Sequence, residues 1–101
     1  MFVGGRKGGM ERHEQTLKVV NPLGLHARAA AQLVKLTARM RCDVLLESEG
    51  QNVNGKSIMG VLTLAAAQGS DVTVTCSGEQ AAESLAQIAQ LFALGFHELS
   101  P

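Results

Sequence analysis

The sequence predicts an α+β fold, an open-faced sandwich with the order βαββαβα in which three helices cover one face of a four-stranded antiparallel sheet. Segments with strand-like alternation and segments with helical period follow one another in this order along the 101 residues. Each helical segment has one apolar face, and this pattern suits a sheet that is covered on one side only. Apolar residues make up 46% of the chain, whose length has room for one domain.

A turn separates the first predicted strand from the first predicted helix. Residues 16–20 (TLKVV) favour a strand, and the turn residues 21–24 (NPLG) end it. A helix is predicted over residues 27–40, because apolar side chains recur there at the helical interval while polar ones fall on the opposite side. Its apolar stripe consists of Ala30, Leu33, Val34, Thr37 and Ala38.

A hairpin and a short helix come next. Residues 43–48 and 51–54 are predicted as paired strands around a tight turn at Glu49 and Gly50. The apolar, alanine-rich residues 58–67 then favour a helix, for which Ser57 is available as the N-cap.

The last two elements are a strand and a helix. Residues 71–76 (DVTVTC) alternate valine with polar residues, which predicts a strand. Gly78 lies in the turn to the final helix, and Gly95 is expected to stop that helix. The apolar stripe of this helix consists of Ala81, Leu85, Ile88 and Phe92, and Ala82, Ala86 and Ala89 broaden it.

The N-terminal segment is expected to lie outside the domain. Residues 1–9 combine glycines with two basic side chains and show neither helical nor strand period. We therefore predict a disordered extension over residues 1–12 and a single domain over residues 13–101. Met10 is a second candidate for the native start, and the sequence leaves both starts open.

The charge balance argues against nucleic acids and membrane surfaces as partners. The 9 Lys and Arg residues oppose 9 Asp and Glu residues, so no global field attracts a polyanion. Aromatic residues make up 3% of the chain, too few for the stacking surface of an RNA-binding α+β domain. We expect no signal peptide, because no apolar core follows the basic residues near the N-terminus, and no apolar run approaches the roughly 20 residues of a membrane span. We expect a cytoplasmic protein without membrane insertion.

The cysteines and the missing motifs argue against an independent enzyme. Cys42 and Cys76 lack CxxC spacing and a neighbouring histidine, which disfavours a zinc site or a disulfide framework. We predict both as small core residues in a reducing compartment. The chain also lacks a glycine-rich nucleotide loop and recognisable paired carboxylates. The sequence thus predicts no metal and no cofactor.

His26 is the residue that the sequence singles out for chemistry, at the junction of the predicted turn and helix. The first backbone N–H groups of a helix lack partners within it and favour an anion, and Arg28 adds a positive charge in the first turn. The same donors would stabilise a phosphoryl group on the ring. From these residues alone two interpretations stay open: a phosphoryl acceptor, or a helix cap beside a solvated arginine.

Two motifs together carry a resemblance to a known family. Residues 21–31 (NPLGLHARAAA) resemble the active-site loop of the HPr family, the histidine-containing phosphocarriers of the bacterial phosphotransferase system. Residues 53–60 (VNGKSIMG) resemble its regulatory-serine region, and the resemblance covers residues 16–94. It implies that His26 accepts the phosphoryl group through Nδ1 and that Arg28 stabilises it.

The resemblance also implies a regulatory site at the start of the second helical segment. Ser57 would be modified by an ATP-dependent HPr kinase/phosphorylase, Ile58 and Met59 would contact partners, and this helix would lie beside the His26 loop. From the residues alone, Ser57 fits a plain N-cap equally well. The chain departs from the usual family word GLHARPA by having Ala29 in place of proline, and we expect helix entry to survive this change.

The partners implied by the resemblance are protein partners. A monomeric carrier would accept phosphate from enzyme I and pass it to enzyme IIA domains. The alternative is an HPr paralogue of a regulatory, nitrogen-related relay, which would use the same residues. His13 and His97 lie outside an organised loop and are expected to have no role.

Overall fold

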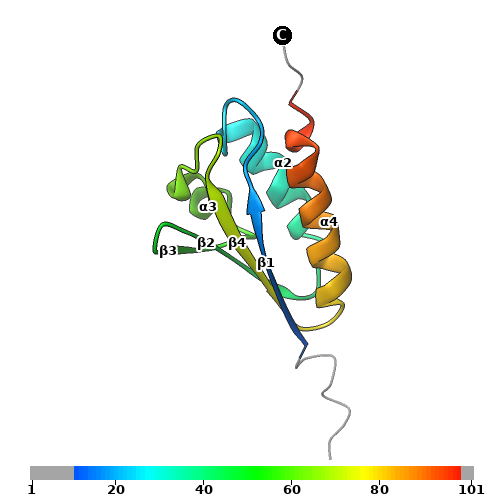
Figure 1. Ribbon diagram of the computed structural model, residues 1–101. Helices are drawn as coiled ribbons and strands as arrows, with labels where there is room; N and C mark the ends of the chain where they lie inside the picture. The colour runs from blue at the N-terminus through cyan, green and yellow to red at the C-terminus, as the bar shows by residue number, and fades with distance from the viewer. Residues whose placement is uncertain (1–10, 99–101) are drawn as a thin grey trace, which may run out of the picture.

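Four strands and three α-helices, in the predicted order βαββαβα, make up the computed structural model, which describes residues 11–98 (Figure 1). The strands are β1 (Arg12–Lys18), β2 (Asp43–Ser48), β3 (Gln51–Asn54) and β4 (Asp71–Ser77). The helices are α2 (Ala27–Thr37), α3 (Ile58–Leu64) and α4 (Ala81–Ala93), and a short 3₁₀ helix, η1 (Gly95–His97), follows α4. Among the described residues, no helix is both long and apolar enough to span a bilayer.

The sheet is antiparallel throughout, and the helices cover one of its faces. Its strand order is β1-β4-β2-β3, so that β4 lies between β1 and β2. The inward side chains of β4, for example Val72 and Val74, are fully buried. On the opposite face, Thr16 and Thr73 share a hydrogen bond of 2.9 Å, and Lys18 pairs with Asp71 at 2.9 Å. This one-sided pattern confirms the predicted open-faced sandwich.

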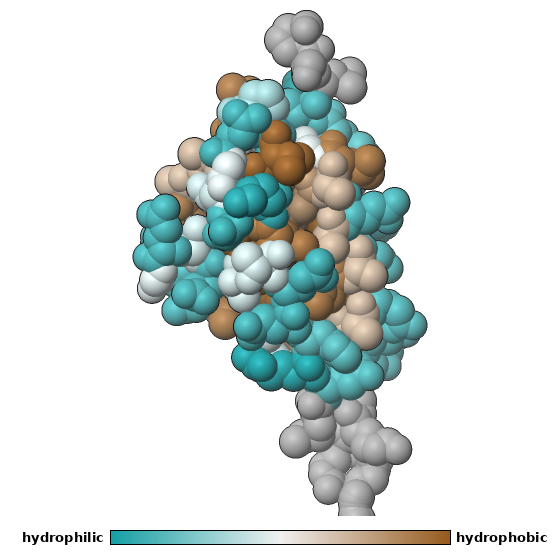
Figure 2. Space-filling model, viewed as in Figure 1, coloured by the Kyte–Doolittle hydropathy of each residue, from teal (hydrophilic) through white to brown (hydrophobic). Residues whose placement is uncertain are grey.

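The core lies between the sheet and the helices. Figure 2 shows apolar side chains along the line where α4 lies against β1, with hydrophilic side chains over the outer parts of the sheet. The predicted stripe of α4 is buried, but Ala82 and Ala86, expected to broaden it, are exposed, and Ser84 and Leu91 are buried instead. The largest fully buried hydrophobic side chains are Phe92, Phe96, Leu33, Leu46, Ile88, Val19, Val61, Val72 and Val74.

The first strand begins earlier than the local pattern predicts. It starts at Arg12 rather than at residue 16, because it pairs with the whole of β4, from Arg12 opposite Ser77 to Lys18 opposite Asp71. The expected boundary between residues 12 and 13 therefore falls inside β1. Residues 1–10 of the predicted extension lie outside the described residues.

Two helices end before their predicted last residues. Helix α2 ends at Thr37 instead of residue 40, and the Thr37 hydroxyl donates a 2.8 Å hydrogen bond to the Gly55 carbonyl. Ala38, predicted in the apolar stripe, is exposed. Helix α3 ends at Leu64 instead of residue 67, because Ala65 adopts the left-handed conformation with a φ of 50°.

Both cysteines are free and buried, which confirms their prediction as core residues. Burial raises the pKa of the Cys76 thiol to about 12, and the neighbouring Cys42 adds to the rise. Because the thiolate is the reactive form of cysteine, Cys76 is a poor nucleophile near neutral pH.

Gly24 fixes the loop before α2 against the segment after α3, and its replacement by alanine should destabilise the fold. The residue has a φ of +69°, and an added Cβ would lie 2.5 Å from the Ala66 carbonyl oxygen. Gly50 is the matched control, because its φ is +81° but an added Cβ would meet no atom within 4 Å.

We expect Gly50→Ala to lower the free energy of unfolding by about 1–2 kcal/mol through backbone strain alone. Gly24→Ala should lower it by a further 1–3 kcal/mol or so, as overpacking typically does. Urea unfolding measures both losses. Equal losses for the two variants would show that the loop moves away from Ala66 without cost.

Candidate functional site

The loop between β1 and α2 is held on both sides by hydrogen bonds. Within it, the Asn21 side chain donates to the Gly24 carbonyl at 2.9 Å, and the Gly24 N–H donates to the Asn21 carbonyl at 3.1 Å. Across from it, the Leu25 N–H donates to the Ala66 carbonyl at 2.9 Å. Figure 1 shows this loop at the same end of the molecule as the end of α4. The next residue, His26, is therefore presented by a fixed backbone.

His26 is the N-cap of α2, at the junction that the sequence predicts. Its backbone is extended, and its Nδ1 accepts a 3.3 Å hydrogen bond from the Arg28 N–H. Because Nδ1 acts as an acceptor, the proton of the neutral ring belongs on Nε2. The side chain is 29% exposed. Nδ1, the atom that the resemblance assigns to phosphoryl transfer, thus lies at the positive end of the helix dipole.

The first turn of α2 offers donors to an anion at this position. It contains no acidic residue. Arg28 is exposed and forms no salt bridge with any residue between 11 and 98. The Ala29 N–H likewise has no acceptor within that range. Although Ala29 stands where the family has proline, α2 begins at Ala27 as predicted, so helix entry does survive the change.

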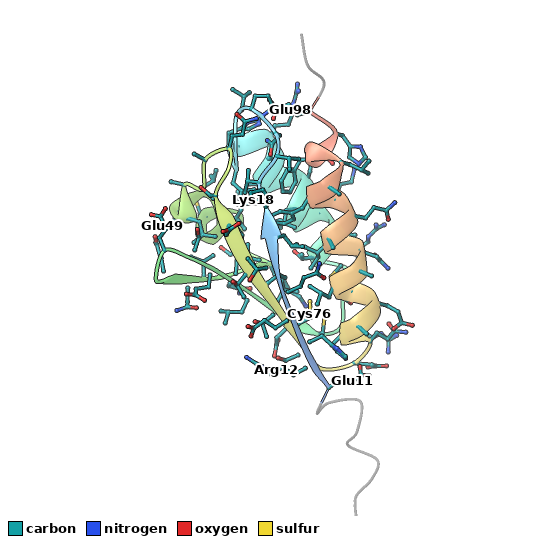
Figure 3. All side chains as sticks on the ribbon, viewed as in Figure 1. Glu11, Arg12, Lys18, Glu49, Cys76 and Glu98 are labelled. Atoms are coloured by element: carbon teal, nitrogen blue, oxygen red, sulfur yellow. The ribbon has the colours of Figure 1, made fainter. Side chains whose placement is uncertain are left out.

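Glu98 and Asn21 belong to this site, and the sequence reasoning did not find them. The Glu98 side chain is only 10% exposed, and its Oε1 lies 2.6 Å from Asn21 Nδ2 and 3.7 Å from His26 Nε2. Figure 3 shows Glu98 beside the loop that precedes α2. Asn21 was predicted only as a turn residue. No local pattern points to Glu98, because its contact with the loop joins the two ends of the domain.

Ser57 is the N-cap of α3, as predicted, with its hydroxyl accepting a 3.1 Å hydrogen bond from the Gly60 N–H. The start of α3 lies near the C-terminal end of α2, where the Gly55 carbonyl accepts from Thr37. The other end of α3 lies beside the His26 loop, through Ala66. Ser57 and His26 therefore lie at opposite ends of the pair formed by α2 and α3.

Apolar side chains at the surface flank these two residues. Ile58 is 43% exposed and Met59 is 74% exposed at the start of α3. Leu23, in the His26 loop, is 65% exposed and was not predicted as a contact residue. Exposed apolar side chains near a reactive group are typical of a protein-binding surface. No group of three or more His, Cys, Asp or Glu residues that could hold a metal ion occurs within residues 11–98.

Comparisons with known proteins agree with this geometry. Residues 13–93 match the family model described as PTS HPr component phosphorylation site. A phosphocarrier protein HPr from Xylella fastidiosa (strain Temecula1) is 42% identical over 85 residues, which are 84% of this chain and 96% of the relative.

Solved structures of HPr proteins share the fold. HPr-C-His from Thermoanaerobacter tengcongensis has a TM-score of 0.83 at 32% identity, covering 87% of this chain and 99% of its own. The phosphocarrier protein HPr from Bacillus anthracis str. Ames has a TM-score of 0.76 at 38% identity, covering 78% of this chain and 94% of its own. The similarity therefore extends over most of the domain in both sequence and structure.

Proposed function

Because the chain belongs to the HPr family, the phosphocarriers of the phosphotransferase system, we propose that enzyme I phosphorylates it on His26 and that an enzyme IIA domain takes the phosphoryl group from it. The observation that carries this assignment is the position of His26 Nδ1 at the N-terminus of α2. A nucleophilic nitrogen there lies beside backbone donors that receive an anion.

The proposed transfer is a displacement at phosphorus. The lone pair of Nδ1 attacks the phosphoryl group of the donor, the Nδ1–P bond forms, and the bond between phosphorus and the donor breaks. Nε2 keeps its proton throughout. The hydrogen bond from the Arg28 N–H to Nδ1 is long, at 3.3 Å, so little is lost when that donor turns to a phosphoryl oxygen. In the second transfer, a nucleophile of the acceptor attacks the same phosphorus and releases Nδ1.

Arg28 supplies a charge for the phosphoryl oxygens in this proposal. Its side chain is exposed at the second position of α2, with no salt bridge to a described residue that would compete for it. A guanidinium pairs with phosphate through several parallel N–H donors, which gives direction as well as strength. Arg28 therefore acts after His26 has met the donor, by stabilising the transferring group.

Ser57 is the proposed point of regulation, where a phosphate would change how partners dock on the surface rather than change the His26 ring. A phosphate on its hydroxyl adds about −1.5 to −2 charges beside Ile58 and Met59, where the proposed partner surface lies. Since Ser57 lies at the opposite end of the pair formed by α2 and α3 from His26, the added charge acts on the docking of partners more than on the ring itself. The Ser57 side chain is half-buried, and its hydroxyl already caps α3. The hydroxyl that a kinase would phosphorylate is thus the same one that caps the helix.

Incubation with enzyme I and labelled phosphoenolpyruvate tests the carrier assignment directly. We expect one acid-labile, alkali-stable phosphoryl group per chain, located on His26 by mass spectrometry. His26→Ala should take up no label, and stoichiometric labelling of this variant would refute the assignment. Parallel reactions with an enzyme I of a sugar system and one of a nitrogen-related system decide which relay the protein serves.

Replacing Arg28 by alanine should slow the transfer without affecting the fold. A charge-assisted hydrogen bond contributes about 1.5–3 kcal/mol, so phosphorylation should slow on the order of tenfold to a hundredfold. Arg39→Ala is the matched control, since Arg39 is also an exposed arginine near α2 but lies beyond its C-terminal end. A rate for Arg28→Ala within twofold of the control, measured by quenched-flow labelling, would remove Arg28 from the site.

Ser57→Asp should slow the reaction with enzyme I more at low salt than at high salt. Aspartate caps a helix about as well as serine, so the fold is expected to persist, while the new negative charge opposes an acidic partner surface. Ser57→Ala separates the two effects, because it removes the cap, at a cost of about 0.5–2 kcal/mol, without adding charge.

Transfer rates across a salt series, with circular dichroism as the folding control, provide the measurement. If Ser57→Asp is folded and as fast as Ser57→Ala at low salt, added charge at this position does not regulate transfer. Ser57 would then be a helix cap only.

A further inference from the structure

We propose that Glu98 is a positioning residue for His26, whose carboxylate orients the Nε2–H of the ring and offsets the positive charge that the ring acquires when Nδ1 bonds to phosphorus. This inference rests on the proposed function, and it assigns a role to the segment that follows α4.

The contacts of Glu98 place a nearly buried carboxylate behind the imidazole. Its Oε1 accepts a 2.6 Å hydrogen bond from Asn21 Nδ2, and Asn21 is itself 3% exposed. His26 Nε2 is buried and has no hydrogen-bond partner among residues 11–98. The nitrogen lies 3.7 Å from the same Oε1. This distance is beyond a hydrogen bond but within the range of an ion pair, and such contacts often tighten when the reacting complex forms.

The fold fixes Glu98 at this position. Phe96 is 1% exposed, and its ring packs against Phe92 with 4.8 Å between ring centroids. Gly95 lies against Asn21, since an added Cβ there would meet the Asn21 Cβ at 3.4 Å. The Glu98 N–H then donates to the Gly95 carbonyl at 3.0 Å. An aromatic anchor and a backbone hydrogen bond therefore direct the carboxylate toward the loop.

Two contacts of the His26 ring both favour the form that carries its proton on Nε2. The Arg28 N–H donates to Nδ1, which requires a lone pair there, and a carboxylate faces Nε2, which favours a proton there. Asn21 cannot supply that acceptor in this arrangement, because its Nδ2 is the atom that faces Glu98 and Gly24. The nucleophilic lone pair is thus held on the side of α2.

The Glu98 carboxylate also affects the step in which the Nδ1–P bond forms. When the Nδ1 lone pair forms the bond to phosphorus, the ring keeps the Nε2 proton and takes on positive charge. A carboxylate with 10% exposure is weakly screened and stabilises that charge. Glu98 should therefore make phosphorylation of His26 faster.

The test uses the full chain and phosphoramidate, a small donor that needs no enzyme I. Its phosphorus–nitrogen bond breaks as the Nδ1–P bond forms, and ammonia leaves with a proton from water. Glu98→Gln keeps the side-chain shape and an oxygen for Asn21 but removes the charge. Glu83→Gln, on an exposed residue in the first turn of α4, removes the same charge at the other end of that helix.

Glu98→Gln should be phosphorylated more slowly than wild type, on the order of tenfold, which corresponds to one pKa unit of differential interaction. Glu83→Gln should react at the wild-type rate. The proton NMR resonance of His26 Nε2–H, recorded near pH 9 where imidazole rings are generally neutral, should move upfield in Glu98→Gln only. A merely structural residue would shift the melting temperature and leave this resonance unchanged in the folded variant.

The outcomes separate this inference from the carrier assignment. A rate within twofold of Glu83→Gln, or an unchanged Nε2–H resonance, overturns the role of Glu98, whether or not enzyme I labels His26. A shifted resonance and a slowed phosphoramidate reaction support it. If enzyme I fails to label His26 in the wild type, the partner assignment is refuted while the coupling between Glu98 and the ring stands.

Discussion

The attachment of the loop before α2 to the segment between α3 and β4 is the constraint on which the site depends. Two hydrogen bonds join Val19 to this segment, one from its N–H to the Ser70 carbonyl and one from the Gly69 N–H to its carbonyl. A third runs from the Leu25 N–H to the Ala66 carbonyl. These bonds enclose the turn on both sides. His26 is thus aimed by backbone contacts to a segment remote in sequence.

Local geometry explains why the central part of the site was predictable. A helix cap is a relation between residues two or three positions apart, so a turn followed by an amphipathic stretch places His26 and Ser57 without any knowledge of the fold. The structure has both residues as N-caps. The burial of one sheet face was predictable for a similar reason, because alternation with period two shows in the sequence directly.

Long-range pairing explains what the sequence did not show. The start of β1 depends on the length of β4, and the end of α3 depends on the contact between Ala66 and the loop. Glu98 is the clearest example, since the sequence around it predicts only the end of a helix. Its role depends on Phe96, which has a φ of 57° and turns the chain back after α4. A positive φ at a buried phenylalanine is a cost that tertiary packing must offset, and local propensity does not predict it.

The antiparallel packing of α2 and α3 separates the two chemical positions while keeping them on one surface. Ser57 caps the start of α3 beside the C-terminal end of α2. Just after the other end of α3, the Ala66 carbonyl accepts the hydrogen bond that holds the His26 loop. Charge added at Ser57 thus lies at the opposite end of this pair from His26. A partner that covers both ends, however, meets the charge at Ser57 and the nucleophile at His26 in the same encounter. The proposed regulation therefore needs no conformational change in the carrier, and its strength is set by the charge of the partner surface and by ionic strength.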